Sequence, residues 1–222
     1  MRRTFVIAGC LACLASVALA EDAYQLDISE KAPAGLSEKV TAAIDPRGMT
    51  ISMKDDAVCT VWLVKSLPLK AKFKSTLTVK YPLAAGELVG ALEVKAAEFS
   101  DFRGQTVKPG VYMLRYGLQP QDGNHVGTSE TSDFLLAIPA ASDTDPAPVK
   151  VPNLMKRSAK ATGSNHPAIF SLLPPDEPPS EATLTHDEGK KLWLLQFTAE
   201  GKQGDDAVKV PFKLVVIGKS EG

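Results

Sequence analysis

Cysteine is scarce in this sequence and badly placed for disulfide formation. The chain of 222 residues has three cysteines, and two of them, Cys10 and Cys13, lie within the first twenty residues. Loss of that segment leaves Cys59 without a partner in the chain, which excludes a disulfide-rich scaffold. The alternation in AVCTVWLV places Cys59 on an apolar face with Val61 and Leu63. We therefore expect a buried, unreactive thiol.

Long hydrophobic runs and an excess of one charge sign are also lacking. After residue 20, no apolar stretch reaches the roughly 20 residues of a membrane-spanning helix. The chain has 25 Lys and Arg against 26 Asp and Glu, and without Arg2 and Arg3 the balance is 23 against 26, a net charge of −3. This balance provides no general attraction to nucleic acid or to an anionic membrane. We predict no nucleic-acid partner and no transmembrane segment in the mature chain. The sequence does not identify the partner, and a protein or a cell-envelope component is the candidate.

The first twenty residues, MRRTFVIAGCLACLASVALA, have the parts of a secretory signal peptide. Arg2 and Arg3 precede an apolar run, and the small-x-small sequence that a signal peptidase accepts ends at Ala20. We predict cleavage there, a periplasmic or secreted location, and a mature chain of residues 21–222. RRTFV resembles a twin-arginine signal and IAGC resembles a lipoprotein box ending at Cys10, but too few residues precede either motif for a normal signal.

Apolar and polar residues alternate with period two through most of the mature chain, and no helical stripe continues for three turns. In KFKSTLTVKY, residues 72–81, one face carries Phe73, Tyr81 and the aliphatic residues between them, while lysines and threonines occupy the other. Half-buried strands of this kind are typical of antiparallel sheets. The sequence predicts eleven strands, at 23–28, 49–54, 57–64, 72–81, 87–94, 111–118, 133–138, 168–173, 182–186, 191–198 and 208–217.

These short strands, separated by Gly, Pro, Asp and Asn, predict an all-β fold, an antiparallel β-sandwich of immunoglobulin-like or jelly-roll-like form. Two proline-rich passages, 139–152 and 173–181, are expected to be crossings, because proline cannot donate to a central ladder. The three strands after residue 181 form too thin a sheet to stand alone, so we expect one domain over residues 21–222. Pro211 within the last strand predicts a sheet edge or a bulge.

The segment KPGVYMLRY resembles the Gly-x-Tyr-x-Leu strand of immunoglobulin-like and prealbumin-like sandwiches. It puts Tyr112 at the start of a strand whose alternate residues, Tyr112, Leu114, Tyr116 and Leu118, share one face. In those sandwiches such a tyrosine fixes a corner through a hydrogen bond from its hydroxyl to the backbone. The resemblance implies the same role for Tyr112.

Three longer blocks resemble a family of secreted bacterial proteins. They are DFRGQTVKPGVYMLRYGLQPQDGNHVGTSETSDFLL, ATGSNHPAIFSL and VPFKLVVIG, and together they span most of the chain after residue 100. The resemblance implies export and a β-sandwich, and it implies no catalytic residue. The N-terminal half has no such resemblance.

Two loop motifs contain an Asn-His pair, in a chain with only three histidines. QPQDGNHVG carries Asp122, Asn124 and His125, and ATGSNHPAIF carries Asn165 and His166. The surrounding Gly, Pro, Asn and Asp are turn-forming residues, so the favoured interpretation of His125 is an exposed loop residue. The alternative is one shared binding site, in which both histidines and the carboxylate of Asp122 act as metal ligands.

Chemistry beyond binding has weaker support. A Zn²⁺ or Cu²⁺ site needs three or four ligands, and no closely spaced ligand motif occurs in the sequence. The segment THDEGKK, which carries His186, is typical of a solvated hairpin turn. The Gly-x-Ser-x-Gly elbow that a serine hydrolase would use does not occur in the sequence. The carboxylate pairs, such as Asp143 with Asp145, are expected to be solvated loop charges and not an acid and base pair.

The sequence therefore predicts an exported, non-catalytic binding or structural module of unknown ligand, without a cofactor. The candidate site is the pair of loops carrying His125 and His166. The first alternative is a periplasmic Zn²⁺ or Cu²⁺ protein using these two histidines with Asp122, and the second is a secreted hydrolase, because loops on a rigid sandwich can host chemistry.

Overall fold

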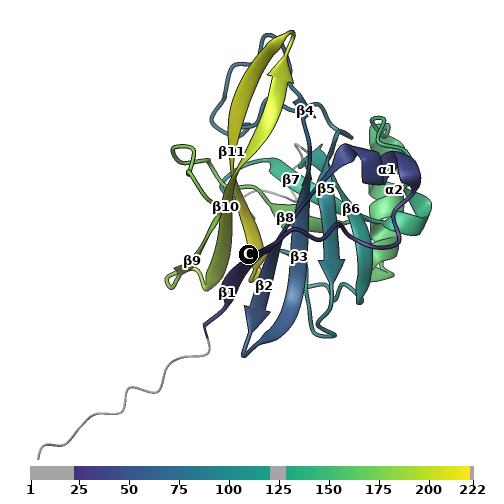
Figure 1. Ribbon diagram of the computed structural model, residues 1–222, viewed down its shortest axis with the longest axis vertical. Coiled ribbons are helices and arrows are strands. Elements are labelled where there is room, and N and C mark those ends of the chain that lie inside the picture. Colours follow the sequence, from purple (N-terminus) through teal and green to yellow (C-terminus); the bar gives the residue numbers. More distant parts are fainter. Residues whose placement is uncertain (1–22, 121–128, 221–222) are drawn as a thin grey trace, which may run out of the picture.

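The chain folds into two β-sheets, and the larger has seven strands. The computed structural model describes residues 23–120 and 129–220, with 45% strand and 11% helix, which confirms the all-β sandwich prediction. The order in the larger sheet is β1-β2-β3-β5-β6-β7-β8, with every pair antiparallel (Figure 1). These strands are β1 (Gln25–Ser29), β2 (Ile44–Met53), β3 (Asp56–Val64), β5 (Leu88–Val94), β6 (Gly110–Leu118), β7 (Asp133–Pro139) and β8 (Ala168–Ser171).

The smaller sheet has the order β11-β10-β4, and β9 also pairs with β10. Its strands are β4 (Leu67–Pro68), β9 (Thr183–Asp187), β10 (Leu192–Gln203) and β11 (Asp206–Ile217). The short contact of β4 with β10 is parallel, and the other two pairings are antiparallel. Pro211 lies on β11 at the end of this order, as predicted for a residue that cannot donate to a central ladder.

The core lies between the two sheets and contains an aromatic group. The ring of Phe212 is 5.1 Å from that of Phe197 and 4.9 Å from that of Tyr81, measured between centroids. The Tyr81 hydroxyl donates to the carbonyl of Leu173 at 2.8 Å and accepts from the backbone N–H of Lys213 at 3.1 Å. Tyr81 thus satisfies its buried hydroxyl, as a buried tyrosine requires.

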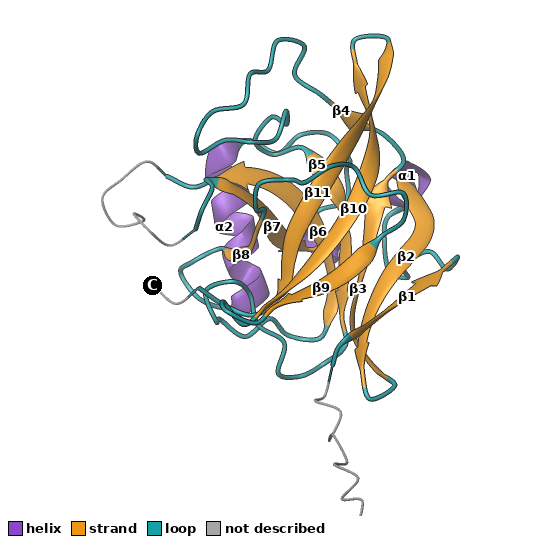
Figure 2. Cartoon of the chain, turned by 90° about the vertical axis from the view of Figure 1, so that its left-hand side faces the viewer, coloured by secondary structure: helices purple, strands orange, loops and turns teal. Residues whose placement is uncertain are grey.

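A helix, α2 (Val151–Thr162), covers the outer face of the larger sheet over β7 and β8 (Figure 2). No helix was predicted here, because no apolar stripe in the sequence continues for three turns. The buried face of α2 consists of Leu154, Ser158 and Ala161, so only one of its buried side chains is large and apolar. Ser158 attaches the helix to β8 by hydrogen bonds, because its hydroxyl accepts from the backbone N–H of Ala168 and donates to the carbonyl of the same residue. A second helix, α1 (Glu38–Ala43), is capped by Ser37.

The strand predicted at 72–81 is absent, and this segment forms a loop. Its backbone is bonded to residues outside any ladder: the N–H of Lys80 donates to a carboxylate oxygen of Asp133 at 2.7 Å, and the carbonyl of Thr78 accepts from Ser132. Leu77, which was expected in the core, is 91% exposed. Alternation alone predicted the strand, but no neighbouring strand pairs with this segment.

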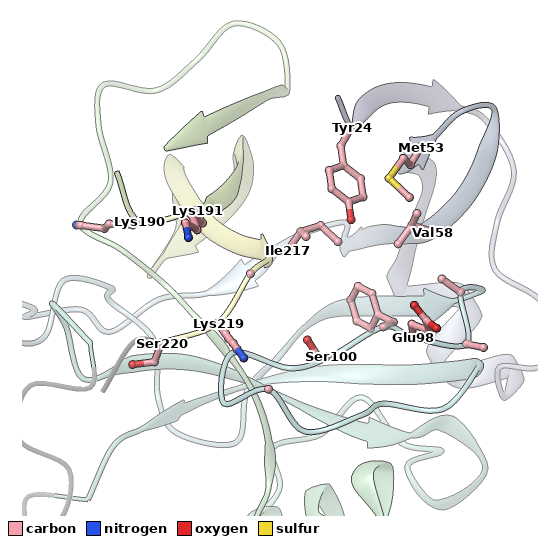
Figure 3. Close-up of a pocket in the computed structure, with 15 residues that line it drawn as sticks. Tyr24, Met53, Val58, Glu98, Ser100, Lys190, Lys191, Ile217, Lys219 and Ser220 are labelled. Atoms are coloured by element: carbon pink, nitrogen blue, oxygen red, sulfur yellow. The ribbon is translucent and has the colours of Figure 1, made fainter. Parts of the chain in front are cut away.

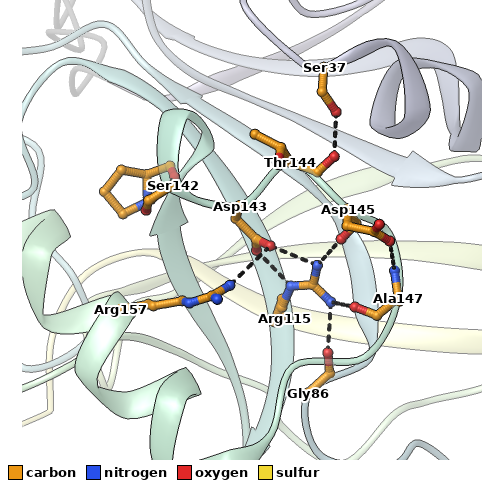
Figure 4. Close-up of polar contacts among 10 residues, drawn as sticks. Ser37, Gly86, Arg115, Ser142, Asp143, Thr144, Asp145, Ala147 and Arg157 are labelled. Atoms are coloured by element: carbon orange, nitrogen blue, oxygen red, sulfur yellow. Dashed lines mark hydrogen bonds and ion pairs between the residues drawn. The ribbon is translucent and has the colours of Figure 1, made fainter.

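The outer face of β6 is buried, although a half-buried strand was predicted there. Arg115 on that face is 0% exposed and forms a bidentate ion pair with Asp143, at 2.6 and 2.9 Å (Figure 4). Its guanidinium also donates to three backbone carbonyls, those of Gly86, Asp145 and Ala147. Asp143 is therefore a buried partner of Arg115, which corrects its assignment as a solvated loop charge. Asp145 is exposed and pairs with Lys39.

Three smaller predictions are confirmed. The Tyr112 hydroxyl donates to the carbonyl of Lys108 at 2.6 Å and closes the predicted corner. Cys59 is fully buried, and burial raises the pKa of its thiol. In THDEGKK, residues 188–191 form the predicted turn between β9 and β10, whereas His186 lies on β9 and pairs with Trp193. Among the described residues, no helix is long and apolar enough to cross a membrane.

Arg115→Met is expected to lower the free energy of unfolding by about 3–5 kcal/mol, because it leaves the buried Asp143 with only its longer ion pair to Arg157, at 3.9 Å. The control Arg47→Met, at an exposed position, should change it by no more than about 0.5 kcal/mol. Urea denaturation of both variants measures the difference. Similar losses at the two positions would contradict a specific role of the buried pair.

Cys59 should not react with a thiol reagent in the native protein, since its thiol is buried and its raised pKa keeps it protonated. Complete labelling is expected in denaturing urea. Rapid labelling under native conditions would show that β3 opens locally.

Candidate functional site

His166 lies in the loop between α2 and β8, and its side chain is exposed, as is that of Asn165. The loop is held by Ser164, whose hydroxyl donates to the carbonyl of His166 at 3.0 Å and to the Gln105 side chain at 2.7 Å. The other predicted site residues, Asp122, Asn124 and His125, lie outside the described residues.

His166 lines a cleft of about 540 Å³ on the outer side of the larger sheet. Phe134, Leu136 and Ile169 contribute apolar wall, and Met155 of α2 closes one side. Pro120, the last described residue before the segment that carries His125, also lines this cleft. The His166 loop and the start of the other predicted loop therefore border one cleft.

Metal ligands do not cluster in the described part of the chain. No group of three or more His, Cys, Asp and Glu side chains there is arranged to hold a metal ion. The ring of His186 stacks on Trp193, with the ring centroids 4.6 Å apart. The metal site of His166 with His125 and Asp122 stays a prediction.

A second cavity, of about 750 Å³, lies between the β2–β3 turn, the loop after β5, the β9–β10 turn and the segment after β11 (Figure 3). Its wall is apolar where Met53, Val58, Phe99 and Ile217 line it. Tyr24 points its hydroxyl into the cavity (Figure 3). Burial raises the pKa of Tyr24, so at neutral pH the hydroxyl remains protonated and able to donate a hydrogen bond.

Three lysines, Lys190, Lys191 and Lys219, line the cavity, and they differ in their partners. Lys190 forms an ion pair with Glu130. Neither Lys191 nor Lys219 has an ion pair within the ranges 23–120 and 129–220. These two lysines lie on one side of the cavity and Glu98 lies on the other (Figure 3).

A close contact at Gly218 packs the segment after β11, which carries Lys219, against the backbone of Lys191. Gly218 has a φ of 107°, and a Cβ on it would lie 2.7 Å from the carbonyl oxygen of Lys191. Only glycine permits this conformation and this close approach. The segment after β11 thus packs directly on the backbone of Lys191, which itself has a φ of 54°. Both lysines therefore line the same cavity from segments that pack against each other.

Asp101 lies between Ser100, which lines the 750 Å³ cavity, and Phe102, which lines the His166 cleft. It accepts backbone hydrogen bonds from Arg103, Gln105 and Ile169, at 3.0, 2.8 and 3.2 Å. The neighbouring Phe102 accepts from the backbone N–H of Ser220, a residue that lines both cavities. Burial raises the pKa of Asp101, and these hydrogen bonds oppose that shift.

The sequence did not predict the 750 Å³ cavity lined by Lys190, Lys191 and Lys219, called the lysine-rimmed cavity from here on. THDEGKK was correctly interpreted as a turn, but nothing in it indicates that Gly218 packs against it. No protein family, curated protein or solved structure matches this chain. The function is therefore argued from the geometry of these two cavities.

If the two histidine loops form a metal site, Zn²⁺ or Cu²⁺ should raise the melting temperature, because a ligand that binds only the native state stabilises it. His166→Ala and His125→Ala should each abolish the rise, because the loss of one of so few ligands leaves an incomplete coordination shell. His186→Ala is the matched control and should leave the rise unchanged. A rise that survives both loop substitutions, or no rise, would exclude this site.

Proposed function

We propose that the protein is an exported, non-catalytic binding module for a small molecule with an anionic group and an apolar body. The single observation that carries this proposal is the pair Lys191 and Lys219 at the 750 Å³ cavity, neither with an acidic partner in the described ranges. Ligand cavities typically measure 300–1,000 Å³, with mostly apolar walls and a few polar groups that orient the ligand.

Each part of the cavity has a role in this proposal. The ammonium groups of Lys191 and Lys219 would bind the anionic group by charge-assisted hydrogen bonds. Tyr24 would donate a further hydrogen bond. The apolar body would replace water against Met53, Phe99 and Ile217, and removal of this apolar surface from water favours binding.

Export is proposed from the signal-like first twenty residues. The metal-binding and hydrolase alternatives remain predictions from the sequence, because no arrangement of the described residues supports either function.

The fluorescent anionic amphiphile 1-anilinonaphthalene-8-sulfonate tests this site. We expect the folded protein to bind it, and Lys191→Gln and Lys219→Gln each to weaken binding about tenfold, the loss of one charge-assisted hydrogen bond. Lys190→Gln, on the same turn but paired with Glu130, should stay within about twofold. Fluorescence titration gives the Kd, and circular dichroism confirms that each variant is folded.

Two further measurements sharpen the test. N-phenyl-1-naphthylamine has the same ring system without the sulfonate, so the lysine substitutions should leave its binding unchanged. Met53→Gln should weaken both probes, whereas Met155→Gln in the His166 cleft should weaken neither. Unchanged sulfonate binding in both lysine variants would refute the proposal, and loss with Met155→Gln would assign binding to the His166 cleft.

A further inference from the structure

The nearly balanced charge of the whole chain conceals a basic region. Residues 57–86 contain five lysines and no Asp or Glu. Four of these, Lys70, Lys72, Lys74 and Lys80, lie in the loop that replaces the predicted strand at 72–81. The loop projects from the same end of the molecule as the β10–β11 hairpin (Figures 1 and 2), and Gln203 of that hairpin donates to the carbonyl of Lys70 at 2.8 Å.

The tip of this loop has a defined conformation. The backbone N–H of Thr76 donates to the carbonyl of Val79, and the N–H of Val79 donates to the hydroxyl of Thr76, both at 2.9 Å. Leu77 and Thr78 therefore form a closed tip. The ammonium group of Lys80 donates to the carbonyl of Thr76 at 2.8 Å, which places a positive charge beside the tip.

The exposure of Leu77 is unusual for this protein. Leu77 is 91% exposed, whereas the other exposed large apolar residues of the described chain, Ile28 and Val151, are 50% and 47% exposed. The loop is anchored to the sandwich below the tip, where Ser132 donates to Thr78 and Asp133 accepts from Lys80. A rigid support thus holds a leucine in water, at a position where a polar residue would fit the turn equally well.

We infer that this loop is a docking surface for an anionic lipid membrane. Leu77 enters the interface between headgroups and acyl chains, and the lysines around it bind the anionic headgroups. An apolar side chain among basic residues is the combination that interfacial membrane binding uses. Each lysine near such a surface adds an attraction that is screened within the Debye length.

The geometry favours a lipid surface over a protein partner. A stable protein interface buries about 1,200–2,000 Å² of complementary surface. Leu77 instead protrudes alone, between the polar neighbours Thr76 and Thr78, both of which are exposed. Asp205 and Asp206 in the turn of the adjacent β10–β11 hairpin are also exposed, so the positive region is bounded on that side.

Co-sedimentation with vesicles tests this inference. The chain from residue 21, which contains every described contact, is mixed at low salt with vesicles of phosphatidylcholine alone or with about one third phosphatidylglycerol. We expect binding to the anionic vesicles only, and its loss at high salt. Lys72→Gln with Lys74→Gln should weaken binding about 25-fold, about fivefold for each lysine. Leu77→Ser should weaken it about tenfold.

Matched variants on α2 provide the control. Val151→Ser removes another exposed apolar residue, and Lys156→Gln with Lys160→Gln removes two exposed lysines. These should change binding by less than about twofold. The inference is overturned if the protein does not bind anionic vesicles or if it binds neutral vesicles equally well. It is also overturned if the α2 variants lose as much vesicle binding as the loop variants do. Binding that depends on the lysines but not on Leu77 would indicate a general polyanion site and would also overturn it.

Discussion

The ion pair of Arg115 with Asp143 is the contact on which the outer layer of the molecule depends. Two charges taken from water cost free energy, and only good geometry with further hydrogen bonds offsets that cost. Arg115 meets this condition, because its remaining donors are bonded to the carbonyls of Gly86, Asp145 and Ala147. Through these contacts, Arg115 of β6 holds the segment between β7 and α2 against the sheet, and α2 begins shortly after this segment.

The strands that pair with neighbours were predictable, since alternation encodes which face is buried. Segment 72–81 alternates equally well, yet Asp133 and Ser132 bind its backbone and Thr76 closes its tip. Asp133 and Ser132 lie more than fifty residues away, and no local pattern in the sequence indicates them. The burial of Arg115 is the same kind of case, because its carboxylate partner is 28 residues distant.

The candidate sites show the same limit. Turn-forming residues correctly placed His166 in a loop, but they gave no sign of the cleft that this loop borders. The lysine-rimmed cavity was not predictable, because Tyr24, Phe99, Lys191 and Lys219 come from four separate segments. One glycine, Gly218, lets the segment that carries Lys219 pack against the backbone of Lys191, and a single glycine in a sequence does not reveal such a contact.

The division of the chain between the two sheets has a consequence for the order of folding. The larger sheet uses strands up to β8, whereas the smaller consists of β9, β10 and β11 apart from the short β4. During synthesis from the N-terminus, the inner face of the larger sheet stays uncovered until these late strands emerge. Its aromatic and aliphatic residues are then open to aggregation. A chaperone that holds the chain until β11 arrives would protect it in this interval, and the lysine-rimmed cavity forms only afterwards.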